Sequence, residues 1–271
     1  MSDGAMEDAL MIDGLTTEFT TFPGRDGQPL VFRTIGDGRP LVLLHGFTGT
    51  GLHFLQSGPA PVLARHGFRV ILPDLRGHGD SARPHDPAAY PPDVLADDGL
   101  ALVDFLGLGD HDGRYELAGY SLGGKVVLRM LARGARPARA IVAGQGLDAL
   151  DGATPRTGGH RQALETIASG RPLEPGSPLA MQADWLAQAG ADPQALLYVL
   201  DTSVPTPGRD LAGITTPVLV VAGDQDERQA SALAAVLPHA RFAEVPGDHG
   251  TAMVSPELAA EMLAFLTDPQ P

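Results

Sequence analysis

The sequence predicts an α/β fold, built on a mostly parallel sheet with helices on both faces. Short apolar runs alternate along the chain with longer segments of helical periodicity, the order expected of strands joined by crossover helices. The runs are almost continuously apolar, as strands covered on both faces are. Prolines stand close to their ends, which disfavours helices of this length.

Four buried strands and four weaker ones are expected. The buried runs are residues 41–44, 70–72, 138–143 and 218–222. Apolar and polar residues alternate more in residues 17–22 and 30–34, and the intervening Asp26-Gly27 pair favours a turn, which predicts an antiparallel edge hairpin. Residues 115–118 and 241–245 read as short strands before two glycine-containing loops.

Apolar side chains recur at helical spacing in three segments between or after these strands. This spacing puts one apolar stripe of each helix against the sheet. The stripes are Leu95, Leu102 and Leu106; Leu122, Val126, Val127, Met130 and Leu131; and Leu258, Met262, Phe265 and Leu266.

The stretch from residue 146 to residue 210 interrupts the alternation. It opens with Gly and Asp, is rich in Pro and Ala, and holds the single tryptophan of the chain, Trp185. We interpret it as a helical cap over the C-terminal ends of the strands, where open α/β sheets bind ligands. The predicted organisation is a core of residues 1–145 and 211–271 and a cap of residues 146–210.

The charge and composition of the chain disfavour several classes of binding partner. The net charge is −14, from 19 basic and 33 acidic residues, which disfavours nucleic acid and anionic membranes. The chain has no cysteine, so disulfides, a thiolate nucleophile and Cys-ligated metals are excluded. Residues 1–14 lack the basic region of a secretory signal, and no apolar run approaches the roughly 20 residues that span a bilayer. We expect a cytoplasmic monomer or homodimer that binds a small-molecule substrate, with no cofactor and no metal ion.

The motif Gly-Tyr-Ser-Leu-Gly at residues 119–123 matches the Gly-x-Ser-x-Gly nucleophile elbow. The bare pentapeptide is weak evidence in a chain with 34 glycines. Here, however, it lies between a predicted strand and a predicted helix, on the sharp turn that the motif requires. Glycines at both flanks leave room for the helix to pass the strand. Ser121 would then project above the sheet at a helix N-terminus, where free N–H groups favour negative charge.

A second motif, His45-Gly46-Phe47, directly follows the buried run at residues 41–44. With it the sequence resembles the α/β-hydrolase superfamily, in which such a turn follows the third strand. The resemblance implies an oxyanion hole made of the backbone N–H groups of Phe47 and Leu122, and a structural role for His45. Residues 74–81 are similar to the family's Asp-x-Arg-Gly-x-Gly-x-Ser loop, to which we assign an architectural role.

A serine needs a base to take its proton, and His249 is the candidate among nine histidines. It lies in a loop directly after the predicted strand 241–245, at the same sheet edge as Ser121. His239 and His66 are expected at the opposite edge. The family has a Gly-His pair at this point, whereas Asp248 intervenes here.

The acid that orients the histidine is expected to be Asp226. Residues 223–226 follow a predicted strand and resemble the family's Gly-x-x-Asp. Asp224 is the rival, and Asp148 or Asp151 would be a less usual placement. The chain order Ser, Asp, His is that of α/β-hydrolases.

A serine at the elbow predicts acyl-enzyme chemistry on a small ester, lactone or thioester, because the resemblance places Asp there in relatives that open epoxides or displace halides. Tyr120 and Trp185 are expected to bind substrate.

Two alternative functions stay open. The residues around the elbow, Lys125 included, also resemble the menaquinone-pathway lyase of this fold, in which the triad would serve as a base. A non-catalytic receptor with the same fold is the other alternative.

Two groups of cations stand near these motifs. Lys125, the only lysine of the chain, lies one turn after Ser121 and is interpreted as a helix-surface charge. A second group is a basic cluster at the start of the predicted cap. We favour its interpretation as a solvated helix face, and the alternative is that it recognises a substrate carboxylate. The cluster consists of Arg156, His160, Arg161 and Arg171.

Overall fold

The computed structural model describes residues 11–12, 14–109, 114–150 and 158–269. These residues form one sheet in the order β1-β2-β3-β5-β4-β6-β7-β8-β9. The strands are β1 (Met11–Ile12), β2 (Leu15–Pro23), β3 (Pro29–Ile35), β4 (Arg39–Leu44), β5 (Phe68–Asp74), β6 (Glu116–Tyr120), β7 (Arg139–Ala143), β8 (Val218–Gly223) and β9 (Ala240–Val245).

Strands β4 to β9 run parallel to one another, and β1, β2 and β3 form an antiparallel edge. Each of the four predicted apolar runs overlaps a central strand of the parallel part. The predicted hairpin is β2 and β3, and Gly27 in its turn has a φ of 81°. The predicted fold class is confirmed.

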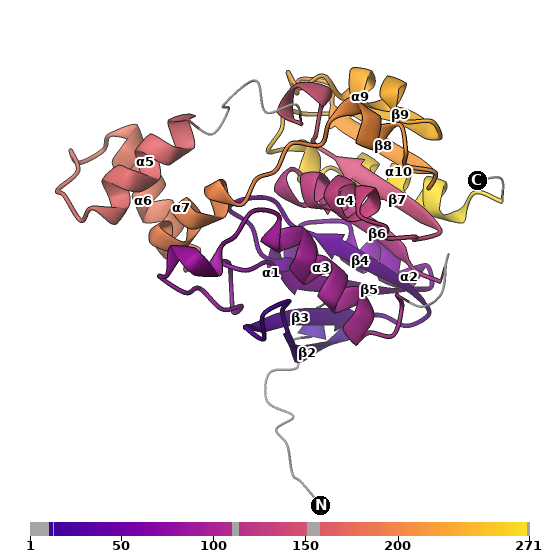
Figure 1. Cartoon of the computed structure of the whole chain (residues 1–271), viewed down its shortest axis with the longest axis horizontal. Coiled ribbons are helices and arrows are strands. Elements are labelled where there is room, and N and C mark those ends of the chain that lie inside the picture. Colours follow the sequence, from indigo (N-terminus) through magenta and orange to yellow (C-terminus); the bar gives the residue numbers. More distant parts are fainter. Residues whose placement is uncertain (1–10, 13, 110–113, 151–157, 270–271) are drawn as a thin grey trace, which may run out of the picture.

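Helices cover both faces of the sheet because alternate residues of its central strands point to opposite sides. Val42 and Leu44 of β4 join the core under α3 (Val94–Phe105), α4 (Leu122–Ala132) and α9 (Ala230–Val236). Leu41 and Leu43 join the core under α1 (Gly51–Gln56), α2 (Ala60–Arg65) and α10 (Pro256–Thr267). In Figure 1, α3 and α4 lie in front of the sheet. Three short 3-10 helices complete this part: Pro87–Ala89, Leu147–Ala149 and Ala252–Val254.

Among the described residues, four α-helices lie between β7 and β8. They are α5 (Gly158–Ala168), α6 (Pro178–Gln188), α7 (Pro193–Asp201) and α8 (Gly208–Leu211). Figure 1 shows α5, α6 and α7 together at one side of the sheet. They share a small apolar core of their own, made of Leu164, Leu186, Leu196 and Leu197, against which Phe47 packs. The predicted division of the chain into a core and a cap stays a prediction.

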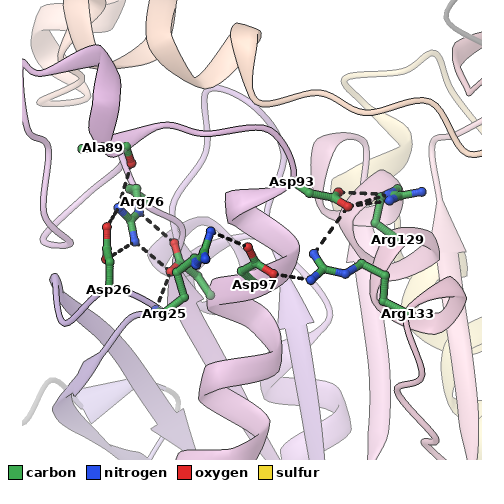
Figure 2. Close-up of polar contacts among 9 residues, drawn as sticks. Arg25, Asp26, Arg76, Ala89, Asp93, Asp97, Arg129 and Arg133 are labelled. Atoms are coloured by element: carbon green, nitrogen blue, oxygen red, sulfur yellow. Dashed lines mark hydrogen bonds and ion pairs between the residues drawn. The ribbon is translucent and has the colours of Figure 1, made fainter.

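Ion pairs hold the loop after β5 and the segment before α3 (Figure 2). Arg76 is fully buried and donates to Asp98 at 2.9 Å and to Asp26 at 2.7 Å. Nearby, Arg129 of α4 donates to Asp93 at 2.9 Å. The Arg76 contacts fit the architectural role expected of residues 74–81.

Candidate active site

Ser121 stands on a strained turn between β6 and α4. Its φ of 55° and ψ of −114° lie outside the regions that a residue with a side chain normally adopts. The flanking glycines are required by close packing: a Cβ on Gly119 would lie 2.3 Å from the carbonyl carbon of Gly123. A Cβ on Gly123 would lie 2.1 Å from the carbonyl oxygen of Leu44. The turn therefore brings α4 against β4 and β6 and places the serine at the C-terminal end of the sheet.

The structure brings Ser121, His249 and Asp226 together. Ser121 Oγ lies 2.9 Å from His249 Nε2, and His249 Nδ1 lies 2.9 Å from Asp226 Oδ2. The Asp226 side chain is 2% exposed. In a neutral ring, Nδ1–H donates to the carboxylate, so Nε2 is free to accept the serine proton.

Backbone contacts hold the loop that carries His249. Tyr120 Oη donates to the His249 carbonyl at 2.6 Å. Asp248 Oδ1 accepts from the Gly250 and Thr251 N–H groups at 2.9 and 2.8 Å, so this added residue caps the turn. The rival acids bind elsewhere: Asp224 accepts from the Gly247 N–H at 2.9 Å, and Asp148 accepts from the Gln229 N–H at 3.1 Å. Asp151 lies outside the described residues.

The electrostatic surroundings favour the charge states that a general base requires. Burial, followed by the Arg228 guanidinium, lowers the pKa of His249, so the ring is neutral at neutral pH. Burial alone would raise the pKa of Asp226, but hydrogen bonds from His249 and Arg228 outweigh it and hold the pKa below its ordinary value. Arg228 Nη1 donates to Asp226 Oδ1 at 2.9 Å. An ionised Asp226 thus faces a neutral imidazole.

The two N–H groups expected to form an oxyanion hole belong to peptides whose carbonyls are held by hydrogen bonds. The Gly46 carbonyl lies 2.8 Å from His45 Nδ1 and accepts from the Gly49 N–H at 2.9 Å. A trans peptide points its N–H away from its C=O, so these bonds set the direction of the Phe47 N–H. Burial is the main cause of the lowered pKa of His45, and its neutral ring accepts at Nε2 from the Leu75 N–H, which leaves Nδ1–H to donate.

The same relation holds for the Leu122 N–H, the second group expected to form the hole. The Ser121 carbonyl accepts from Gln145 Nε2 at 2.5 Å and from the Lys125 N–H at 3.1 Å, which sets the direction of the Leu122 N–H. Within the described part of the chain, neither the Phe47 nor the Leu122 N–H donates to another protein group. Both are therefore free to bind a ligand oxygen.

The family described as "Alpha/beta hydrolase family" matches residues 41–262, well over half of the chain. The chain belongs to the alpha/beta hydrolase family. The resemblance drawn from residues 45–47 and 119–123 is thereby confirmed.

Similar proteins agree on this family. YisY of Bacillus subtilis (strain 168), an AB hydrolase superfamily protein, is 38% identical over 104 residues, which cover 38% of this chain and 36% of YisY. The chain thus spans little more than a third of YisY. A non-heme haloperoxidase of Rhodococcus erythropolis is 29% identical over 278 residues, covering 89% of this chain and 97% of that protein. A solved hydrolase structure from Pseudomonas aeruginosa PA01 has a TM-score of 0.74 at 25% identity and covers 92% of this chain and 98% of its own.

In this family member a cavity of about 470 Å³ opens at Ser121. Both residues expected to bind substrate line it, Tyr120 from β6 and Trp185 from α6. The Tyr120 hydroxyl is already committed to the His249 carbonyl, so only its ring is available to a ligand. Trp185 is 46% exposed.

Some of the basic residues near the site line the cavity, and others do not. The interpretation of Lys125 as a helix-surface charge is wrong, because its side chain lines the cavity and donates to Ser203 Oγ. His160 also lines the cavity, with its ring 5.9 Å from that of Phe47. Arg161 pairs with Asp201, and neither Arg161 nor Arg171 lines the cavity. Arg156 lies outside the described residues.

Two residues that the sequence analysis missed contact the site. Gln145 reaches back to the Ser121 carbonyl, and Arg228 binds Asp226. No local motif marks either residue, because each acts through a side chain whose direction only the fold determines.

The described residues contain no group of three or more His, Asp or Glu side chains able to hold a metal ion. They also contain no helix with the length and apolar character needed to cross a membrane.

Proposed function

We propose that this hydrolase cleaves a small carboxylic ester, lactone or thioester through an acyl-enzyme on Ser121. One observation carries the proposal: the continuous hydrogen-bonded chain from Ser121 through His249 to Asp226, with 2.9 Å at each contact. This chain opens on a cavity large enough for a small organic substrate.

In the first half of the proposed reaction, Ser121 Oγ forms a bond to the substrate carbonyl carbon as its proton passes to His249 Nε2. The negative charge that develops on the carbonyl oxygen is held by the N–H groups of Phe47 and Leu122. The carbon–oxygen or carbon–sulfur bond to the leaving group then breaks, and the leaving group takes the proton from His249.

Water completes the cycle. It attacks the acyl carbonyl while His249 takes one of its protons, and the bond to Ser121 Oγ breaks as that proton returns to the serine. The products are a carboxylic acid and an alcohol or thiol, and for a lactone a single hydroxy acid. Asp226 stays ionised throughout and stabilises the imidazolium that forms.

We propose in addition that residues 146–210 form a cap and that residues 1–145 and 211–271 form the core. The cavity supports this division, because its lining combines Ser121 and His249 from the sheet with Trp185 and Leu200 from helices α6 and α7. A cap in this place would exclude water from the acyl-enzyme. The cytoplasmic location and the monomer or homodimer stay predictions.

The test is labelling with a serine-directed phosphonate beside a panel of nitrophenyl esters of increasing acyl length and simple lactones. Wild-type protein reacts with the phosphonate, and Ser121→Ala abolishes the label. Ser121→Ala and His249→Ala each lower kcat by something on the order of 10⁶, the scale seen for residues that act as a unit. Ser57→Ala, at an exposed serine that does not line the cavity, is the matched control and keeps both label and activity.

The same experiment separates the alternatives. A non-catalytic receptor would react with neither phosphonate nor ester. A lyase that uses the triad only as a base would cleave no ester in the panel. Either result would overturn the proposed function.

A further inference from the structure

The charge of the cavity is opposite to that of the chain as a whole. The protein carries 33 acidic and 19 basic residues, yet no Asp or Glu of the described chain lines the cavity. The lining does include the two basic side chains Lys125 and Arg228. A wall with this composition favours an anionic ligand, because fixed positive charge raises the local concentration of anions.

Of these two basic side chains, only one has a carboxylate partner among the described residues. The charge of Arg228 is compensated by Asp226 at 2.9 Å. Lys125 Nζ donates to the neutral Ser203 Oγ, and no carboxylate of the described residues forms an ion pair with it. The nearby Asp93 is committed to Arg129 at 2.9 Å and to Arg133 at 3.4 Å.

The surroundings of Lys125 make its isolated charge costly. Burial, and then the Arg129 guanidinium, lower the pKa of Lys125. Both effects disfavour the ammonium form, and a bound anion would oppose both. The side chain starts one helical turn after Ser121, since the Lys125 N–H donates to the Ser121 carbonyl at 3.1 Å. Its side chain lines the same cavity as Ser121.

We infer that Lys125, with the Ser203 hydroxyl beside it, binds a carboxylate of the substrate. The inference rests on the proposed function and deepens it: the substrate is an ester, lactone or thioester that bears a carboxylate away from the scissile bond.

The test compares kcat/KM within two matched pairs of esters. In the first pair the carboxylate is on the acyl side: 4-nitrophenyl hydrogen adipate is compared with 4-nitrophenyl hexanoate. In the second it is on the leaving group: 4-acetoxybenzoate is compared with 4-acetoxybenzamide. Wild-type protein prefers the charged ester in one pair, and that pair identifies the side of the scissile bond that faces Lys125.

The variants locate the preference. Lys125→Met lowers the ratio of charged to neutral kcat/KM by roughly 10- to 100-fold, the effect of losing a charge-assisted hydrogen bond. Lys125→Arg retains most of the preference because it keeps the charge. Arg171→Met is the matched control: it removes an exposed cation that does not line the cavity and leaves the ratio unchanged.

The outcomes distinguish this inference from the proposed function. Cleavage of esters by wild-type protein without preference for the charged member of either pair would overturn the inference alone, and so would an unchanged ratio in Lys125→Met. Failure to cleave any of the four esters would overturn the proposed function and the inference with it.

Discussion

The two acids that follow β8 allow a sharp test of which carboxylate orients the base. Asp226 Oδ2 lies 2.9 Å from His249 Nδ1, and its Oδ1 accepts from the Arg228 side chain at 2.9 Å and from the Arg228 N–H at 3.2 Å. In Asp226→Asn the amide has one oxygen and one NH₂ group. Arg228 offers two donors, so the oxygen stays on that side and the NH₂ group faces His249.

This arrangement forces the wrong tautomer on the base. His249 Nδ1 must accept from the new amide, so the ring proton moves to Nε2, which can no longer accept from Ser121. The corresponding change in serine proteases lowers kcat by about 10⁴, or roughly 5.5 kcal/mol of transition-state stabilisation. We expect a loss of this size in kcat for ester hydrolysis, with the melting temperature measured alongside to show that the fold is retained.

Asp224→Asn is the matched control. Asp224 is exposed, and within the described residues its carboxylate accepts a hydrogen bond only from the Gly247 N–H. An amide oxygen can accept that bond equally well. Its kcat should stay within about tenfold of wild type, well short of the loss expected for the triad acid. A severe loss in Asp224→Asn together with a mild one in Asp226→Asn would refute the assignment.

Three further predictions follow from the same contacts. The pKa of His249 is lowered and its neutral form is the active one, so kcat/KM should fall on acidification with a midpoint below pH 6.5. A profile of kcat/KM measured from pH 4.5 to 8 with its midpoint above 6.5 would contradict this. Gly123→Ala places a Cβ 2.1 Å from a backbone oxygen of β4, so urea unfolding should show a free energy of unfolding lower by about 3 kcal/mol. Gly208→Ala is the control: the space around Gly208 is open, so the same measurement should change by less than about 1 kcal/mol. Arg76→Met leaves the buried Asp98 without its cation. It should lower the free energy of unfolding by about 3–5 kcal/mol, which corresponds to a fall of roughly 6–20 °C in melting temperature. A fall under about 3 °C would show that the ion pair is not needed for stability.

Local sequence signals were sufficient for the sheet and for the sharp turn that carries Ser121. The central strands were predictable because residues covered on both faces must be apolar throughout, and that requirement appears as an uninterrupted run. Ser121 was predictable because its turn needs glycines at both flanks, where any Cβ would meet backbone atoms. His249 and Asp226 were predictable from their places directly after β9 and β8, since the carboxyl ends of parallel strands meet at one edge.

The surroundings of these residues could not be predicted in the same way. Gln145 and Arg228 follow strands as many residues do, and nothing in their neighbours shows which atoms they reach. Lys125 was misinterpreted because its helical position alone describes a surface residue. Its place in the cavity depends on Ser203, 78 positions further along the chain, which lies beside it only in the folded protein.

The sequence by itself thus determined the α/β architecture, the elbow and the candidate residues of the triad, because each depends on steric and hydrophobic requirements that act over a few neighbouring residues. Only the tertiary structure decided which of two acids faces the histidine, how the carbonyls of Gly46 and Ser121 are held, and which cation lines the cavity. These contacts join residues as many as 78 positions apart, and their distances follow from how the strands and helices pack together.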